Sequence, residues 1–493
     1  MEKTAKRWLV LTVAGAGLLA VFLDSAVNIA FPAISAAFGR GVSSIQWVVV
    51  CYMLTSASLL LTCGRLADLF GCQRALLIGL VGSAAAFGLC GVAGTFESFL
   101  ASRVLQGAAA ALVLASAPAV VSANFSPREL GRALGVLNMV GFVGFTSGPI
   151  LGGLLVEHFG WRAVYLFRVP LSLGTIALAM LLPREEVPRS SDREFDFLGS
   201  VALAAGVGLA GVGLALAAVK GLHSSAWKSP QMLGLACGSA ASFALLITME
   251  RRARYPLLDR RWLAAALVFA NASNLLSNLA MFAVWLLVPY YVVNVLRFKV
   301  SAGGALLAPC SLGMALSAPF AGALSDRFGA RWPQLLGLAV EMLGLLLASQ
   351  LGLRSSFSTV AVPLLLVGLG LGTFAVANMR LVMTSIGRAD QGIAAGVVGM
   401  MRTLGVVTGA SSAAAVFGMR RKVYQAALTS ASLTPQALAD QSFISAFQDT
   451  FLVSTALCLV AVVLAAIPVR YRDVLAAEEP TEAENRTCPV QQP

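Results

Sequence analysis

Long runs of apolar residues, separated by short charged or Gly- and Pro-containing segments, constrain this chain more than any other feature of its sequence. A helix needs about 20 apolar residues to cross a bilayer, and most of these runs are long enough. Of the 493 residues, 58% are hydrophobic and only 12% are charged, whereas soluble domains carry about 25% charged residues. We therefore predict an all-α polytopic membrane protein without large extramembrane domains. The fourteen predicted transmembrane helices lie near residues 8–32, 43–63, 74–94, 98–122, 131–156, 161–182, 197–219, 230–250, 263–293, 303–322, 334–353, 360–384, 391–417 and 445–468.

The basic residues serve as topology signals in this pattern. A net charge of +12 would suggest nucleic acid as a partner of a soluble chain, but here Lys and Arg lie between apolar runs, so nucleic acid is excluded. With both termini in the cytoplasm, the segments on that side hold 21 Lys and Arg residues and those outside hold 10. This bias predicts a multi-pass protein of the cell inner (plasma) membrane with both termini cytoplasmic.

The sequence offers no pattern for an enzyme or a metal site. None of the eight cysteines belongs to a CxxC pair, and the two histidines, His158 and His223, have no nucleophile or ligand spacing beside them. We expect no catalytic residues, no metal and no cofactor. Two of the cysteines, Cys72 and Cys488, are predicted to lie in cytoplasmic aqueous segments.

Two loops of the sequence recur in the same order. The segment GRLADLFG at residues 64–71 returns as GALSDRFG at residues 322–329, and a glycine pattern at residues 131–148 returns at residues 392–409. The repeat predicts two parallel six-helix halves around a midplane cavity. The predicted domains are residues 1–190 (N-terminal six-helix bundle), 191–255 (inserted helices 7 and 8), 256–470 (C-terminal six-helix bundle) and 471–493 (a disordered cytoplasmic tail).

Several motifs resemble the major facilitator superfamily and, within it, the fourteen-helix drug:proton antiporter family of multidrug efflux proteins. LDSAVNIAFP at residues 23–32 resembles the first-helix motif of the fourteen-helix group, and Arg103, Gln106 and Gly107 resemble the helix-4 arginine motif. The signature loop between helices 2 and 3 is matched by Gly64, Asp68, Gly71 and Arg74, and in the second half by Asp326, Arg327 and Gly329. The antiporter motif of helix 5 is matched by Gly144, Gly148, Pro149, Gly152 and Gly153. The chain departs from the family at Leu69, Cys72 and Gln73, and at Arg168, where an asparagine is usual.

The resemblance implies a major facilitator fold and a proton-coupled antiporter that exports drug-like amphipathic or cationic small molecules by alternating access. The implied partners are the lipid bilayer, a small-molecule substrate and protons, and a periplasmic adaptor protein is a further candidate. Two alternatives stay open, namely a dedicated exporter of one metabolite, lipid or antibiotic on the same fold, and a non-transporting membrane scaffold or sensor.

Ionisable residues inside the spans are the strongest functional candidates, since each costs at least about 2.5–3.5 kcal/mol at the bilayer centre. Asp24 and Arg103 lie at similar depths in the first and fourth helices, and an arginine could close the gap between them. Burial and a neighbouring arginine both alter the proton affinity of an acid, so these two residues are candidates for proton coupling; a static ion pair is the alternative. Glu341 is a second candidate acid, and Arg402 lies deep enough to pair with it. Arg380 lies near the end of its span and can snorkel.

The remaining candidates concern conformational change and substrate binding. An acid at a helix start interacts with the helix dipole, so Asp68 and Asp326 either cap helices or latch a moving interface. The helix-5 glycines lie on one face and favour close helix packing. In helix 9 the spacing of Asn271, Asn274, Asn278 and Trp285 predicts either a cavity wall or interhelical hydrogen bonds. Arg168 and Arg402 complete the residues predicted to line the substrate cavity.

Overall fold

The structure, a computed structural model, describes residues 2–40, 47–182, 197–220, 230–250, 265–297, 300–386, 390–428 and 434–467. These residues form helices and connecting turns and contain no strand. The N-terminal half comprises α1 (Glu2–Phe22), the 3₁₀ turn η1 (Leu23–Ala26), α2 (Val27–Phe38), α4 (Trp47–Phe70), α5 (Cys72–Val92), α6 (Phe96–Asn124), α7 (Leu130–Phe159), α8 (Ala163–Leu166) and α9 (Arg168–Met180). Two further helices follow, α10 (Phe197–Lys220) and α12 (Pro230–Glu250). The C-terminal half comprises α13 (Ala265–Tyr290), the π-helical turn η3 (Tyr291–Val295), α14 (Val300–Phe328), α15 (Arg331–Ala348), α16 (Phe357–Thr384), α17 (Gln391–Leu428) and α18 (Pro435–Ala466).

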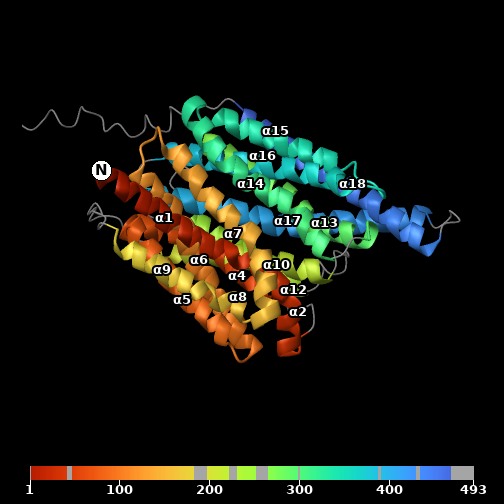
Figure 1. The fold of residues 1–493 in the computed structure, drawn as a ribbon, viewed down its shortest axis with the longest axis horizontal. Coiled ribbons are helices and arrows are strands. Elements are labelled where there is room, and N and C mark those ends of the chain that lie inside the picture. The colour runs from red at the N-terminus through yellow and green to blue at the C-terminus, as the bar shows by residue number, and fades with distance from the viewer. Residues whose placement is uncertain are drawn as a thin grey trace, which may run out of the picture.

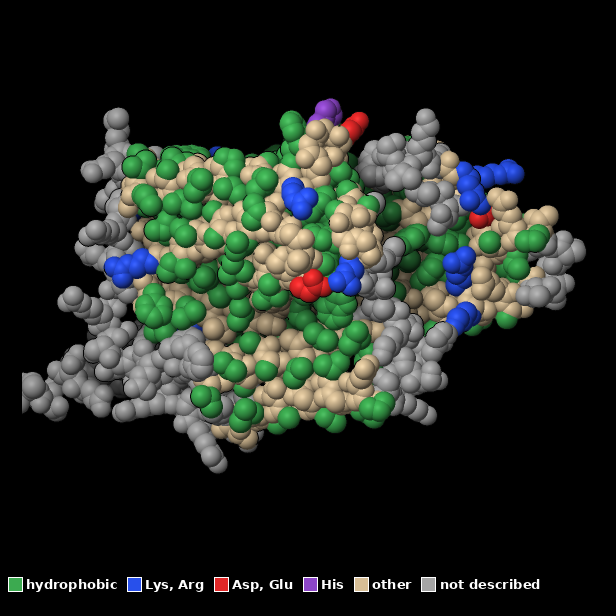
Figure 2. All heavy atoms as spheres, turned by 90° about the horizontal axis from the view of Figure 1, so that it is seen from below, with side chains coloured by type: hydrophobic (Ala, Val, Ile, Leu, Met, Phe, Trp, Pro, Cys, Tyr) green, Lys and Arg blue, Asp and Glu red, His purple; other side chains and the backbone are tan. Residues whose placement is uncertain are grey.

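Within the described residues, eleven helices are long and apolar enough to cross a bilayer. The chain is therefore a multi-pass membrane protein, as its composition predicts. The helices α10, α12 and α15 lie on three further predicted runs, and the total of fourteen spans stays a prediction. On the face drawn in Figure 2, hydrophobic side chains are spread over the described surface and charged side chains are few, as expected of a surface that faces lipid.

Helices of the N-terminal half gather on one side of the molecule and α14, α15 and α16 on the other (Figure 1). Two helix pairs join the halves, because α7 packs along α14 and α4 packs along α17. The inserted helix α10 lies against α4 and α17, where Ala202, Leu203 and Val207 pack on Leu60 and Ile393. The predicted domain boundaries at residues 190 and 255, and the predicted tail, lie outside the described residues.

Both signature segments are helical rather than loops, contrary to the sequence prediction. α4 continues to Phe70 and α14 to Phe328, so Asp68 and Asp326 lie in the last turns of their own helices. Each helix ends at a glycine in the left-handed region, Gly71 with φ 97° and Gly329 with φ 81°. Because no strong helix breaker precedes these glycines, the polar motif extends the helix instead of ending it.

The last two helices also exceed their predicted bounds of 391–417 and 445–468. α17 continues to Leu428, and α18 begins at Pro435, where the Thr434 side chain accepts a hydrogen bond from the Ala437 amide at 3.3 Å. The added turns are polar, and Arg420 in the extension of α17 pairs with Asp449 of α18, with Nε 2.5 Å from Oδ2. A helix outside the bilayer needs no apolar run, so hydropathy alone misses such extensions.

Candidate functional site

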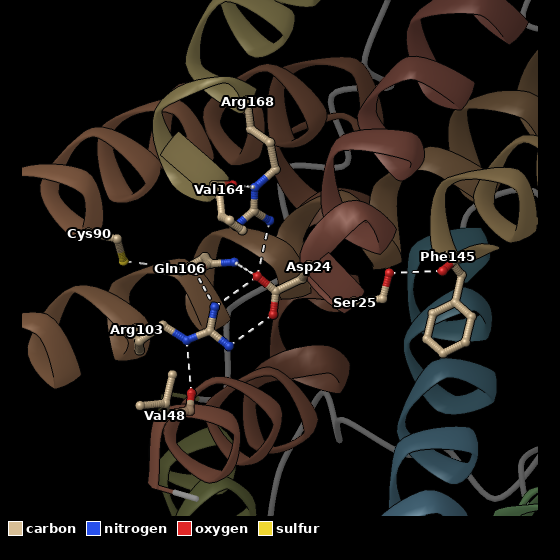
Figure 3. A network of polar contacts seen from close by, with 9 residues as sticks. All are labelled: Asp24, Ser25, Val48, Cys90, Arg103, Gln106, Phe145, Val164 and Arg168. Atoms are coloured by element: carbon tan, nitrogen blue, oxygen red, sulfur yellow. Dashed lines mark hydrogen bonds and ion pairs between the residues drawn. The ribbon is translucent and has the colours of Figure 1, made fainter. Parts of the chain in front are cut away.

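A buried polar network surrounds Asp24, which lies in η1, between α1 and α2 (Figure 3). Arg103 of α6 binds both carboxylate oxygens, with Nη1 2.8 Å from Oδ1 and Nη2 2.9 Å from Oδ2. Arg168, the first residue of α9, places its Nη1 3.0 Å from Oδ1, and Gln106 donates from Nε2 to the same oxygen at 2.8 Å. The structure thus adds Arg168, which we predicted to be in the substrate cavity, to the predicted pair of Asp24 and Arg103.

The network carries more positive than negative charge. Both arginine residues are fully buried, and the Asp24 side chain is 11% exposed. One carboxylate therefore faces two guanidinium groups, and Nη2 of Arg168 has no hydrogen-bond partner in the described residues. Aromatic rings also stabilise the two cations. The Arg103 guanidinium lies 4.6 Å from the Tyr52 ring centroid, and the Arg168 guanidinium lies 4.2 Å from the Phe87 ring centroid.

Local geometry fixes the position of Asp24. The first span changes from α-helical to 3₁₀ over residues 23–26, a break that is typical of hinges and functional sites. Directly after the acid, the Ser25 hydroxyl donates to the Phe145 carbonyl of α7 at 2.9 Å. The glycines of α7 permit this approach, because a Cβ atom at Gly148 or Gly152 would overlap Ser25 or Ala26.

The predicted antiporter motif is therefore the face of α7 that packs on the first span. Gly144 meets Leu19, whereas Gly153 has only a distant neighbour in Ile29. Pro149 lies inside α7, and the helix continues through it to Phe159. In the other half, Gly405 and Gly409 of α17 pack on Leu275 and Leu279 of α13 in the same manner.

The two repeated aspartates cap helices of the opposite half. Asp68 accepts hydrogen bonds from the backbone amides of Gly392 at 2.6 Å and Ile393 at 2.8 Å, at the start of α17. Asp326 accepts from the amides of Gly131 and Arg132, both at 2.8 Å, at the start of α7. Each acid therefore caps a helix across the interface rather than its own helix. The capping alternative is found in this form, and the latch role stays a prediction.

This crossing defines one end of the molecule, where α4 and α14 finish and α7 and α17 begin; we call it the latch end. Gly64 contacts the Gly392 backbone, and Gly131 likewise contacts Gly322. Arg380 Nε lies 2.9 Å from Asp326 Oδ1, so this residue is an ion-pair partner and does not snorkel, contrary to the prediction. Arg7 and Glu129, 3.0 Å apart, put the start of α1 at the same end.

Four of the predicted latch residues make no such contacts between the halves. Gly71 and Gly329 provide the left-handed turns described above. Arg74 is exposed in the first turn of α5, and Arg327 is exposed with its guanidinium 5.2 Å from the Phe328 ring centroid. Cys72 is only 7% exposed at the start of α5, so its thiol is shielded from water. The prediction that its segment faces the cytoplasm stays a prediction. Cys488 lies outside the described residues.

Glu341 and Arg402 are not an ion pair, contrary to one of the two predicted alternatives. Glu341 is fully buried and accepts a hydrogen bond from the Ser277 hydroxyl at 2.7 Å, while its other oxygen has no partner in the described residues. The Arg402 guanidinium instead lies 5.2 Å from the Phe22 ring centroid in the other half. Depth in the membrane allows the pair, but the two side chains leave their helices in different directions.

The asparagine stripe of α13 is buried packing rather than an open cavity wall. Asn271, Asn274 and Asn278 are 7%, 3% and 5% exposed. Asn274 donates across the helix interface to the Val398 carbonyl of α17 at 2.8 Å, whereas the other two donate to carbonyls one turn back in α13. Trp285 is partly exposed, and its ring centroid lies 4.9 Å from that of Phe145 across the halves.

Several contributing residues were not predicted in these roles. Gln106, Tyr52 and Tyr165 surround the two arginine residues, and Ser277 binds the second acid. Gln106 belongs to a recognised motif, so its spacing of three from Arg103 is a usable signal. Ser277 has none, because a lone serine in an apolar run is common. Among the described residues, no group of three or more His, Cys, Asp or Glu side chains is arranged to hold a metal ion.

Comparison with known proteins agrees with this geometry. Residues 13–410 and 270–490 match the model of the Major Facilitator Superfamily. The chain is 34% identical over 411 residues to multidrug resistance protein Stp of Mycobacterium tuberculosis, covering 81% of this chain and 74% of that protein. It is 29% identical to the tetracenomycin C resistance and export protein of Streptomyces glaucescens, covering 84% and 75%. It is 25% identical to riboflavin transporter RibZ of Clostridioides difficile, covering 95% and 99%.

Solved structures share the fold at low sequence identity. The human organic anion transporter MFSD10 (TETRAN) aligns with a TM-score of 0.61 and 17% identity over 92% of this chain and 99% of that chain. A bacterial homologue of the iron transporter ferroportin in its outward-facing state aligns with a TM-score of 0.61 and 14% identity, over 96% and 99%.

Proposed function

The chain belongs to the Major Facilitator Superfamily, and from this premise we propose that it exports drug-like amphipathic small molecules in exchange for protons, by alternating access. Relatives named for multidrug resistance and for antibiotic resistance and export support the direction of transport. The proposal includes the inner membrane as its location, the latch end as the cytoplasmic end, and a periplasmic adaptor as a candidate partner.

The observation that carries proton coupling is the single carboxylate of Asp24 between two buried guanidinium groups. In the described conformation the acid is ionised, because protonation would leave Arg103 and Arg168 without a counter-charge. A conformational change that withdraws either arginine lowers the advantage of the ionised form, and a proton can then bind. Proton binding and helix movement thus become coupled at one side chain.

Glu341 complements this site in the other half. Its buried carboxyl group has one hydroxyl donor and no cation in contact, so the neutral, protonated form is favoured when the latch end is closed. The cycle we propose holds a proton on Glu341 while Asp24 is ionised, and reverses the two protonation states when the latch end opens.

Alternating access itself is supported by the crossed caps at the latch end. Hydrogen bonds and ion pairs between the two halves lie there at Asp68, Asp326, Arg65 and Arg380. Opening that end must break both caps and separate the close glycine contacts of α4 with α17 and of α7 with α14.

The test is Asp24→Asn in proteoliposomes with and without an imposed pH gradient. The variant should still exchange substrate across the membrane but should lose uphill export driven by the gradient. Asp440→Asn is the matched control, since it removes a carboxylate from the surface pair with Arg297, 3.2 Å away. Export by Asp24→Asn at the wild-type rate would remove Asp24 from the mechanism.

A companion variant covers the case in which Asp24→Asn folds poorly. The double change Asp24→Asn with Arg168→Gln removes one charge of each sign and keeps the net charge of the network. It should fold better than the single variant and remain uncoupled. The same liposomes, loaded with several unrelated compounds, separate a multidrug exporter from a dedicated exporter of one compound.

A further inference from the structure

Arg402 is a membrane-embedded arginine for which the described residues provide no acidic partner. It lies in α17, about 17 Å from the start of that helix at the latch end by the rise per residue. The buried arginine residues Arg65, Arg103 and Arg168 have acidic partners, because Arg65 lies 3.6 Å from Asp390 and the other two share Asp24. The half-buried Arg380 binds Asp326. In the described part of the chain, the salt bridges include none to Arg402, and its guanidinium stacks on Phe22 of α1.

Neither contact with lipid nor snorkelling to the membrane surface explains the position of the Arg402 side chain. A cation at such a depth costs at least about 2.5–3.5 kcal/mol unless it is paired or hydrated. Arg402 points across the interface to α1 of the other half rather than outward, so it cannot snorkel along the lipid-facing surface. It is also partly exposed, unlike the fully buried Arg103 and Arg168, and can therefore meet a ligand or water.

Neither of the nearby acids Asp24 and Glu341 is free to pair with Arg402. Phe22 lies two residues before Asp24, but the Asp24 oxygens already accept from two guanidinium groups and one amide. Glu341 is fully buried against Ser277. Arg402 and the Asp24 network, which lies inside the N-terminal half, together carry three guanidinium groups and one carboxylate. Such a balance attracts anions and disfavours organic cations.

We propose that the guanidinium of Arg402 binds an acidic group of the exported compound, so that substrates are aromatic acids rather than organic cations. The partly exposed Phe22 ring beside it offers flat apolar surface to the aromatic part of such a molecule. A carboxylate can accept two parallel hydrogen bonds from a guanidinium group. This inference rests on the proposed export function and names the substrate class of its site.

The experiment uses two dyes, anionic fluorescein and cationic ethidium, with purified protein. Binding is followed by fluorescence anisotropy in detergent, and export by dye movement in proteoliposomes. The variants are Arg402→Gln, Arg402→Lys, and the control Arg354→Gln, which removes an exposed arginine from the turn between α15 and α16.

We expect fluorescein to bind wild type and Arg354→Gln equally and to bind Arg402→Gln at least about tenfold more weakly, equivalent to about 1.4 kcal/mol. Arg402→Lys should recover part of the affinity, because it restores the charge without the planar fork. Fluorescein that binds Arg402→Gln as tightly as wild type, or fails to bind wild type, overturns the inference. Export of ethidium alone by wild type also overturns it and leaves the proposed function standing, whereas fluorescein binding without export of either dye counts against the proposed function.

Discussion

At the scale of single residues, the two buried acids differ in what their surroundings supply. Asp24 receives hydrogen bonds from two guanidinium groups and an amide, so its negative charge is over-compensated. Glu341 receives one hydrogen bond from Ser277 and no cation. Removing an ionised partner from a buried pair strands the other charge, whereas removing a neutral acid strands nothing. The two sites should therefore respond in opposite ways to amide substitution.

We predict that Asp24→Asn lowers the stability of the protein by about 3–5 kcal/mol, because two guanidinium groups lose their counter-charge. Glu341→Gln should change it by less than about 1 kcal/mol, since an amide oxygen can still accept from Ser277. Thermal unfolding in detergent measures both. Equal destabilisation by the two variants would mean that Glu341 is ionised in the folded protein. The double change of Asp24→Asn with Arg168→Gln is the control, and should recover part of the lost stability.

At the scale of helices, glycine determines how closely the two halves can approach. Along α4 and α17, Gly64 and Gly392 let the backbones touch, and Gly396 lies against the Leu60 carbonyl. The equivalent pair of α7 and α14 uses Gly131, Gly135 and Gly322. Only at this distance can a carboxylate at the end of one helix reach the amides at the start of the other.

A methyl group at Gly64 should hold the latch end open. In Gly64→Ala the new Cβ would overlap the Gly392 carbonyl, and overpacking of this kind costs about 1–3 kcal/mol, or about 5- to 150-fold in the population of the closed form. Cys63, 5% exposed beside Gly64, should then react at least about fivefold faster with a thiol reagent in a variant without other cysteines. Gly88→Ala is the control, because a Cβ there meets nothing within 4 Å. An unchanged rate in Gly64→Ala would show that the closed contact adjusts to a methyl group.

At the scale of the whole molecule, the structure is closed at the latch end, and Arg402 and the Asp24 network lie deeper. Arg40 and Glu97, 2.6 Å apart, join α2 to the start of α6 at the opposite end. If the latch end is cytoplasmic, this conformation is closed on the cytoplasmic side. The orientation of the protein in the membrane therefore decides which compartment the closed latch end faces.

Orientation can be read from exposed positions at the two ends. In a cysteine-free background, Glu97→Cys should be labelled by a membrane-impermeant thiol reagent on intact cells, and Arg128→Cys should be labelled only after the cells are broken. Both residues are exposed, Glu97 at the start of α6 and Arg128 just before α7 at the latch end. Labelling of Arg128→Cys on intact cells would reverse the orientation. The native Cys72 is unsuitable because it is buried.

The sequence by itself determined the class, the fold and the depth of the charged groups. Apolar run length predicts spans, and the rise of a helix converts residue number into depth, so Asp24 and Arg103 could be matched before the structure was known. The repeated motif likewise predicted two related halves and singled out Asp68 and Asp326. Each of these properties depends only on the position of a residue along a helix, and that position can be read from the sequence.

The tertiary structure alone decided which side chains face one another. Arg168 pairs with Asp24, Arg402 stacks on Phe22 rather than pairing with Glu341, and the asparagine stripe packs within the protein. It also decided that each repeated aspartate caps a helix of the opposite half. Depth is a local quantity, but contact depends on the rotation of each helix about its axis and on which helices are neighbours. Both are set by close packing among helices far apart in sequence, where a glycine or a single buried charge selects one arrangement over another.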